Sequence, residues 1–122
     1  HREHAYGVVF VTGHAQPGAQ GTDWVALAHT ARDARLTLVI YMGVSQAAHI
    51  QHGLLSGLPA STPVAIVQNT SLPHQRHAVT TLGSLQHTIH HEQLGSPAVM
   101  VVGDVVRGVA AVQSTTTHVR AA

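Results

Sequence analysis

Short apolar runs interrupted by glycine constrain the fold of this chain most strongly. The clearest run is Leu36–Met42, in which nearly every residue is apolar or β-branched and after which Gly43 follows at once. Further strands are predicted at Tyr6–Gly13, Pro63–Gln68, His77–Thr81 and Ala98–Val102. Runs of this length and residue type are typical of buried β-strands, so the sequence predicts about five strands.

Helices are predicted between these strands. Asp23 is expected to cap a short helix, because aspartate readily accepts hydrogen bonds from the first N–H groups of a helix. The apolar residues of this helix are Trp24, Leu27 and Ala28. Ser45 is expected to cap a second helix, from about Gln46 to Leu55. Its predicted apolar face consists of Ala47, Ile50 and Leu54.

A third helix is predicted from Leu82 or Ser84 to Leu94, with Leu85, Ile89 and Leu94 pointing inward. Strands and helices in this order indicate an α/β fold, a single layered domain with a mostly parallel or mixed sheet of about five strands flanked by helices. This domain is expected to span residues 1–107. Residues 108–122 are rich in Ala, Val and Thr without clear periodicity and are expected to form a disordered tail.

Composition excludes several classes of protein. Hydrophobic residues make up 44% of the chain and charged residues 9%, which favours a compact globular fold. Six arginines, no lysine and five acidic residues give a net charge of +1, so nucleic-acid binding gains no support. The absence of cysteine excludes disulfides, thiolate metal sites and a cysteine nucleophile.

The lengths of the apolar runs argue against a membrane-spanning segment. The longest are about 6–7 residues, too short to span a bilayer. No signal-peptide pattern is visible, and nothing points outside the cytoplasm, so a cytoplasmic location is expected.

Common catalytic motifs are missing. Twelve histidines suggest a metal site, but the chain has five acidic residues to support one and lacks the H-E-x-x-H motif, so no metal is expected. There is no G-x-S-x-G motif, and the glycine pairs match neither a dinucleotide loop nor a phosphate loop. The residues alone therefore predict an α/β domain without an obvious chemistry.

Several short segments, which follow one another in a characteristic order along the chain, indicate a function. The segments are His1-Arg2-Glu3, Phe10–His14, Asp23-Trp24 with Ala26–Ala28, Thr37–Gly43, Thr62–Ala65, Gln68–Thr70, Gln75-Arg76, Thr81-Leu82 and Ser96–Ala98 with Val101–Gly103. Together they resemble the C-terminal half of the uroporphyrinogen-III C-methyltransferases, members of the tetrapyrrole methylase family. The resemblance covers roughly residues 1–107. Phe10–His14 and Tyr41-Met42-Gly43 favour this branch over methylases that act later on the corrin ring.

The resemblance implies a two-domain α/β enzyme, usually a homodimer, with its active site in the cleft between the domains. Enzymes of this family bind S-adenosylmethionine in that cleft and methylate C2 and C7 of uroporphyrinogen III, which gives precorrin-2 for sirohaem and cobalamin synthesis. The family's N-terminal half is not recognisable in this sequence. The chain alone is therefore expected to be inactive and to bind the cofactor weakly or not at all.

The resemblance also assigns binding roles to individual residues. Met42 is expected to contact the cofactor, as is the turn of Asn69 and Thr70, although Thr70 stands where the family has a small residue. Arg2, with His1, is expected to bind the carboxylates of the tetrapyrrole. Arg76 is a weaker candidate for the same role, and His14 is either a polar contact at the cleft rim or an ordinary loop histidine.

Two other interpretations remain open at this stage. One is a non-catalytic α/β module that serves dimerisation or regulation, and the other is a methylase acting later on the corrin ring. The sequence does not indicate whether the parent protein is a lone methylase or is fused to a sirohaem-synthesising dehydrogenase.

Overall fold

A computed structural model describes residues 7–14, 21–68, 75–95, 98–104 and 106 of the chain. The elements in chain order are β1 Gly7–Thr12, α1 Trp24–Ala34, β2 Leu36–Tyr41, the 3-10 turn η1 Val44–Gln46, α2 Ala47–Leu54, β3 Pro63–Gln68, β4 Arg76–Thr81, the 3-10 turn η2 Leu82–Ser84, α3 Leu85–His91 and β5 Ala98–Val102. All five predicted strands are present. The predicted tail at 108–122 lies outside the described residues.

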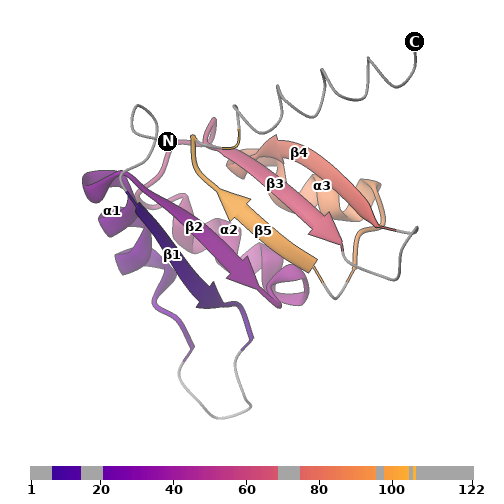
Figure 1. The fold of residues 1–122 in the computed structure, drawn as a ribbon, viewed down its shortest axis with the longest axis horizontal. Coiled ribbons are helices and arrows are strands. Elements are labelled where there is room, and N and C mark those ends of the chain that lie inside the picture. The colour runs from indigo at the N-terminus through magenta and orange to yellow at the C-terminus, as the bar shows by residue number, and fades with distance from the viewer. Residues whose placement is uncertain (1–6, 15–20, 69–74, 96–97, 105, 107–122) are drawn as a thin grey trace.

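The five strands form one mixed sheet in the order β1-β2-β5-β3-β4. β1 and β2 are parallel, whereas β2 with β5, β5 with β3 and β3 with β4 are antiparallel. Helices α1, α2 and α3 all lie on one face of this sheet (Figure 1). The predicted α/β class is confirmed, and of the two predicted kinds of sheet the mixed one is correct.

Asp23 caps α1 as predicted, because its Oδ1 accepts a 3.0 Å hydrogen bond from the N–H of Ala26. The helix is longer than the short one expected and runs for 11 residues. It ends where Arg35 adopts a left-handed conformation with φ of 56° and donates its N–H to Ala31, a common way to end a helix. This turn leads directly into β2.

The prediction that Ser45 caps the second helix is wrong. Ser45 lies inside η1, which closes when the N–H of Gln46 donates to the carbonyl oxygen of Gly43 at 3.0 Å. Helix α2 starts only at Ala47, and its first residues receive no hydrogen bond from a capping side chain. The predicted apolar face is confirmed: Ala47, Ile50 and Leu54 are all buried.

The third helix is shorter than predicted, because α3 ends at His91. Leu94 is nevertheless buried, since the chain turns at Gln93, where φ is 53°, and brings Leu94 back to the core. The N-terminus of α3 is capped from another helix. Gln51 on α2 accepts a 2.7 Å hydrogen bond from the N–H of Gln86 and donates one to the Gly83 carbonyl oxygen at 3.2 Å.

The core lies between the sheet and the three helices. Alternate strand residues point toward the helices and are buried, among them Leu38, Ile40, Val64, Ile66 and Met100. The other face of the sheet keeps several exposed apolar side chains. Within the described parts of the chain, no helix is long and apolar enough to cross a membrane.

Candidate functional site

The carboxyl ends of β1 and β2 lie side by side at one edge of the sheet. Thr12 is opposite Tyr41, and the N–H of Gly13 donates a 2.6 Å hydrogen bond to the Tyr41 carbonyl oxygen. A Cβ atom on Gly13 would overlap the Cα of Gly43 and lie 3.1 Å from the Met42 carbonyl oxygen. The absence of a side chain at Gly13 is therefore what lets the two strand ends approach so closely.

Met42 leaves β2 in an unusual conformation. Its φ is 55°, in the left-handed region that a residue with a side chain seldom occupies. Met42 is 54% exposed, so it does not fill a gap in the core. Ligands in open α/β sheets bind at the carboxyl ends of strands, and a methionine thioether adapts well to apolar ligand surfaces. Met42 is thus in place to contact a ligand.

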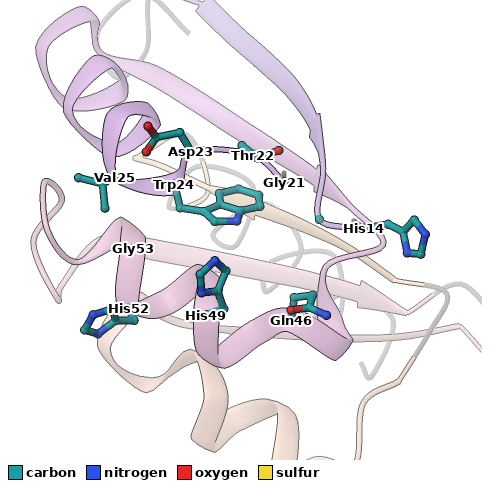
Figure 2. Close-up of a pocket in the computed structure, with 11 residues that line it drawn as sticks. His14, Gly21, Thr22, Asp23, Trp24, Val25, Gln46, His49, His52 and Gly53 are labelled. Carbon is teal, nitrogen blue, oxygen red and sulfur yellow. The ribbon is translucent and has the colours of Figure 1, made fainter. Parts of the chain in front are cut away.

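A cavity of about 410 Å³ opens beside these strand ends (Figure 2). Trp24, at the start of α1, forms part of its wall, while Gln46 and His49 approach from the side of α2. The indole is only 5% exposed, and a Cβ atom on Gly53 would lie 2.5 Å from the Trp24 Cβ, so α1 and α2 are in close contact here. The result is a concave surface that combines an aromatic ring with polar groups.

The two ends of the loop after β1 line the cavity on another side. His14 lines it, and the His14 N–H donates to the Thr12 hydroxyl oxygen at 3.1 Å. The hydroxyl of Thr22 donates to the Thr12 carbonyl oxygen at 3.2 Å. These two bonds hold both ends of the loop against the end of β1.

Three imidazoles line this cavity, those of His14, His49 and His52. Across the described ranges, however, no group of three or more histidine or acidic side chains could hold a metal ion.

Perturbed charges lie away from the cavity. A hydrogen bond from Arg32 lowers the pKa of the Asp33 carboxyl, and the same contact raises the pKa of Arg32. Their side chains form a 2.9 Å ion pair near the end of α1, opposite to the end at which Trp24 lies. Both side chains are largely exposed, so this pair contributes little to stability.

The predicted site residues fall into three groups. Met42 and His14 lie at the same strand ends, as the resemblance implies. Arg76, the weaker candidate for a tetrapyrrole carboxylate, is on edge strand β4, with its guanidinium 3.9 Å from the Glu92 carboxylate. The other four, His1, Arg2, Asn69 and Thr70, lie outside the described residues.

Gln68 was not singled out from the sequence as a structural contact. It is the last described residue of β3, directly before the predicted turn of Asn69 and Thr70. Its Oε1 accepts a 2.8 Å hydrogen bond from the N–H of Gly95, which ties the end of β3 to the segment after α3.

The sequence also did not indicate that one cavity is lined by Trp24, Gln46 and His49. The three-residue spacing of Gln46 and His49 is compatible with one helical face, but it did not indicate that this face meets Trp24. The closest available signal was Gly53, whose missing side chain makes room for the indole.

Comparison with known proteins identifies the relatives of the chain. It is 41% identical over 108 residues to the siroheme synthase of Hydrogenovibrio crunogenus, and 44% identical over 107 residues to siroheme synthase 2 of Yersinia enterocolitica. Among solved structures, a uroporphyrin III C-methyl transferase from Thermus thermophilus superimposes with a TM-score of 0.71 at 29% identity, covering 88% of this chain.

The chain belongs to the tetrapyrrole methylase family. It spans about a fifth of the length of the siroheme synthases, 22% and 21% respectively, and 44% of the Thermus methyltransferase chain. The Thermus enzyme has also been solved in complex with S-adenyl homocysteine, at the same TM-score of 0.71. A cobalt precorrin-4 methyltransferase, 16% identical with a TM-score of 0.68, shares the fold. No protein-family model matches the chain.

Proposed function

We propose that this tetrapyrrole methylase chain is the C-terminal half of an enzyme that transfers methyl groups from S-adenosylmethionine to C2 and C7 of uroporphyrinogen III, giving precorrin-2. The other half of the same enzyme supplies the second wall of the cleft. The proposal includes a homodimer, taken from the resemblance, and a cytoplasmic location, suggested by the composition. It is supported by the siroheme synthase relatives and by the Thermus methyltransferase complex with S-adenyl homocysteine.

The position and exposure of Met42 are the observation that best supports the proposal. An exposed, apolar and polarisable side chain projects from the carboxyl end of β2, where the fold places ligands. Gly13 and Gly43 lie at the same strand ends in close contact, and neither adds a side chain beside Met42. These features fit a ligand that combines a flat purine with an aliphatic sulfonium, so the residues present suit S-adenosylmethionine.

S-adenosylmethionine supplies an already activated methyl group, so the protein needs no nucleophilic side chain of its own. The residues of this chain would bind and orient the reactants and exclude water. Met42 and the Asn69–Thr70 turn would hold the cofactor, while Arg2, with His1, would bind carboxylates of the tetrapyrrole through charge-assisted hydrogen bonds.

Rejoining the two halves tests the proposed function. We expect the 122-residue chain alone to show no cofactor binding at micromolar concentration by calorimetry, because one wall of the cleft is missing. The same chain fused to a tetrapyrrole methylase N-terminal half should bind S-adenosylmethionine and produce precorrin-2, identified by absorbance and mass spectrometry. A fused protein that binds cofactor but yields a differently methylated corrin would favour the later methylases. A fused protein that neither binds nor methylates would favour a non-catalytic module.

The substitution Met42→Gly distinguishes the role of the Met42 side chain from the strain in the Met42 backbone. We expect Met42→Gly to leave the free energy of unfolding unchanged or raise it by up to about 1 kcal/mol, because glycine adopts a positive φ without strain. In the rejoined enzyme the same change should weaken cofactor binding about tenfold or more, since the apolar contact is lost.

Gln93→Gly is the matched control for Met42→Gly. Gln93 has almost the same φ, 53°, and an exposed side chain, but it follows α3 rather than β2. Denaturant unfolding should show a similar effect on stability for both variants, and calorimetry should show weakened cofactor binding for Met42→Gly alone. Equal cofactor affinities in the two variants would exclude a cofactor contact by Met42.

A further inference from the structure

The cavity beside the Met42 turn contains a hydrogen-bond donor without a partner. Trp24 is 5% exposed, and its indole lies against the cavity, facing His49 (Figure 2). The indole N–H donates to no described residue. Within the described parts of the chain, the Thr37 hydroxyl is the only fully enclosed side-chain polar atom that lacks a partner, so the indole nitrogen is open to the cavity that Trp24 lines. A ligand atom that accepts a hydrogen bond there would satisfy this donor.

The N-terminus of α1 opens onto the same cavity. Residues 21–25 lead into this 11-residue helix and line the cavity. The side chain of Asp23 accepts a hydrogen bond from the N–H of Ala26, whereas the N–H groups of Trp24 and Val25 donate to no described residue. Unpaired N–H groups at the start of a helix carry a partial positive charge and favour an anion.

The side chains around the cavity also favour a group that accepts hydrogen bonds. His14, His49 and His52 line it, and each imidazole has an N–H to donate. Asp23 is the one acidic residue among the described lining residues, but its Oδ1 is engaged in the cap of α1 and its carboxylate points away from His49 in Figure 2. Since donors predominate, a carboxylate, which only accepts, is the matching ligand group.

The size and position of the cavity fit one pyrrole ring with its acidic groups. Its volume of about 410 Å³ is near the lower end for ligand pockets, so it suits a small substituted ring and is too small for a whole tetrapyrrole. Each pyrrole ring of uroporphyrinogen III carries one acetate and one propionate. Gly13, which lines the cavity, is in close contact with Gly43, so the cavity adjoins the turn that presents Met42 to the cofactor.

We propose that this cavity binds an acetate or propionate group of the tetrapyrrole substrate. The carboxylate accepts hydrogen bonds from the indole N–H of Trp24, from the imidazole of His49 and from the first N–H groups of α1. The inference rests on the proposed function for the identity of the substrate, but binding of the carboxylate requires no methyl transfer. The cofactor also carries a carboxylate, at its methionine end, so the experiments must distinguish these two sources.

Porphobilinogen, a single pyrrole with one acetate and one propionate, is a suitable probe for the 122-residue chain without cofactor. Trp24 is the only tryptophan in the chain, so a proton–nitrogen correlation spectrum contains a single indole resonance. We expect millimolar porphobilinogen to move this resonance and the Val25 amide resonance downfield, because both N–H groups gain an acceptor. Free methionine should leave both resonances in place. Shifts with methionine but not with porphobilinogen would assign the cavity to the cofactor and overturn the proposal, as would no shift with either.

Two variants test the donors. His49→Ala should weaken porphobilinogen binding about fivefold, because a hydrogen bond to a charged group is lost. His87→Ala is the matched control, since His87 is also an exposed helical histidine but lies on α3, outside the cavity. Trp24→Phe keeps an aromatic ring and removes the N–H, so binding, followed at the Val25 amide, should fall about tenfold. If Trp24→Phe does not fold, His49→Ala decides alone. Affinities in the variants equal to that of His87→Ala would overturn the proposal.

The rejoined enzyme separates the substrate from the cofactor. There, His49→Ala should raise the KM for uroporphyrinogen III about fivefold and leave the Kd for S-adenosylmethionine unchanged. A raised Kd for S-adenosylmethionine with an unchanged KM would overturn the proposal while the methyltransferase function stands. Because porphobilinogen binding is measured on the chain alone, its outcome is independent of whether the rejoined enzyme transfers methyl groups.

Discussion

Replacing Gly13 with alanine is expected to lower the free energy of unfolding by about 2–4 kcal/mol, more than a typical single substitution. The new methyl group would overlap the backbone of Gly43 and lie 3.0 Å from its nitrogen. Backbone atoms cannot swing away as a flexible side chain can, so the end of β1 must separate from the end of β2. This movement would strain or break the 2.6 Å hydrogen bond from Gly13 to Tyr41.

Gly95→Ala is the matched control, because no atom lies within 4 Å of a Cβ built on Gly95. Alanine there should change stability by less than about 1 kcal/mol, and a small gain is expected from the reduced freedom of the unfolded chain. Urea denaturation of both variants measures the difference. In the rejoined enzyme, Gly13→Ala should also weaken cofactor binding, since it displaces Met42. Equal stability of the two variants would show that the strand ends are not in close contact.

Truncation of Ile40 is expected to lower the free energy of unfolding by an amount comparable to that of Gly13→Ala. The cause is the opposite one, because truncation leaves a cavity whereas Gly13→Ala creates a clash. Ile40 is fully buried in β2, two residues before Met42, and its Cγ2 lies 2.9 Å from where a Cβ of Gly43 would be. Ile40→Ala removes three carbon atoms from a closely packed core and should cost about 3–4 kcal/mol.

Ile40→Val provides the graded control for this truncation. It keeps both atoms branching from Cβ and removes only the terminal methyl, so about 1 kcal/mol is expected. Denaturation midpoints of the wild type and the two variants should therefore fall in order of the volume removed. If Ile40→Ala costs no more than Ile40→Val, the layer beneath the Met42 turn is not packed as the structure describes.

Local residue types were sufficient to predict several parts of the fold. The strand at Leu36–Met42, the cap at Asp23 and the apolar face of Ala47, Ile50 and Leu54 follow from periodicity and capping chemistry. Each of these features depends on residues that are close together in the sequence. The cofactor-side role of Met42 came from the resemblance, and the structure places its side chain in solvent at the expected strand end.

The predictions of helix caps were wrong where residues distant in the sequence determine a local conformation. Ser45 has the chemistry of a helix cap, but a 3-10 turn anchored at Gly43 precedes the helix, and crowding of Gly43 by Met100, Ile40 and Ile50 accompanies that turn. Helix α3 receives its cap from Gln51, 35 residues before Gln86, instead of from its own flanking serine. No local pattern indicates partners so far apart in the chain.

Residue types and their order along the chain were enough to predict the α/β class, the approximate positions of all five strands and the family, because apolar periodicity and ordered motifs are local properties. Tertiary structure decided which strands are neighbours, and with that the site. Gly13 meets Gly43 only because β1 pairs in parallel with β2, and Trp24 meets Gly53 only because α1 packs on α2. It also decided that the helices cover one face of the sheet, which leaves Phe10 and Tyr41 exposed on the other face. These are contacts between segments far apart in the chain, and the residues of one segment do not specify which other segment they meet.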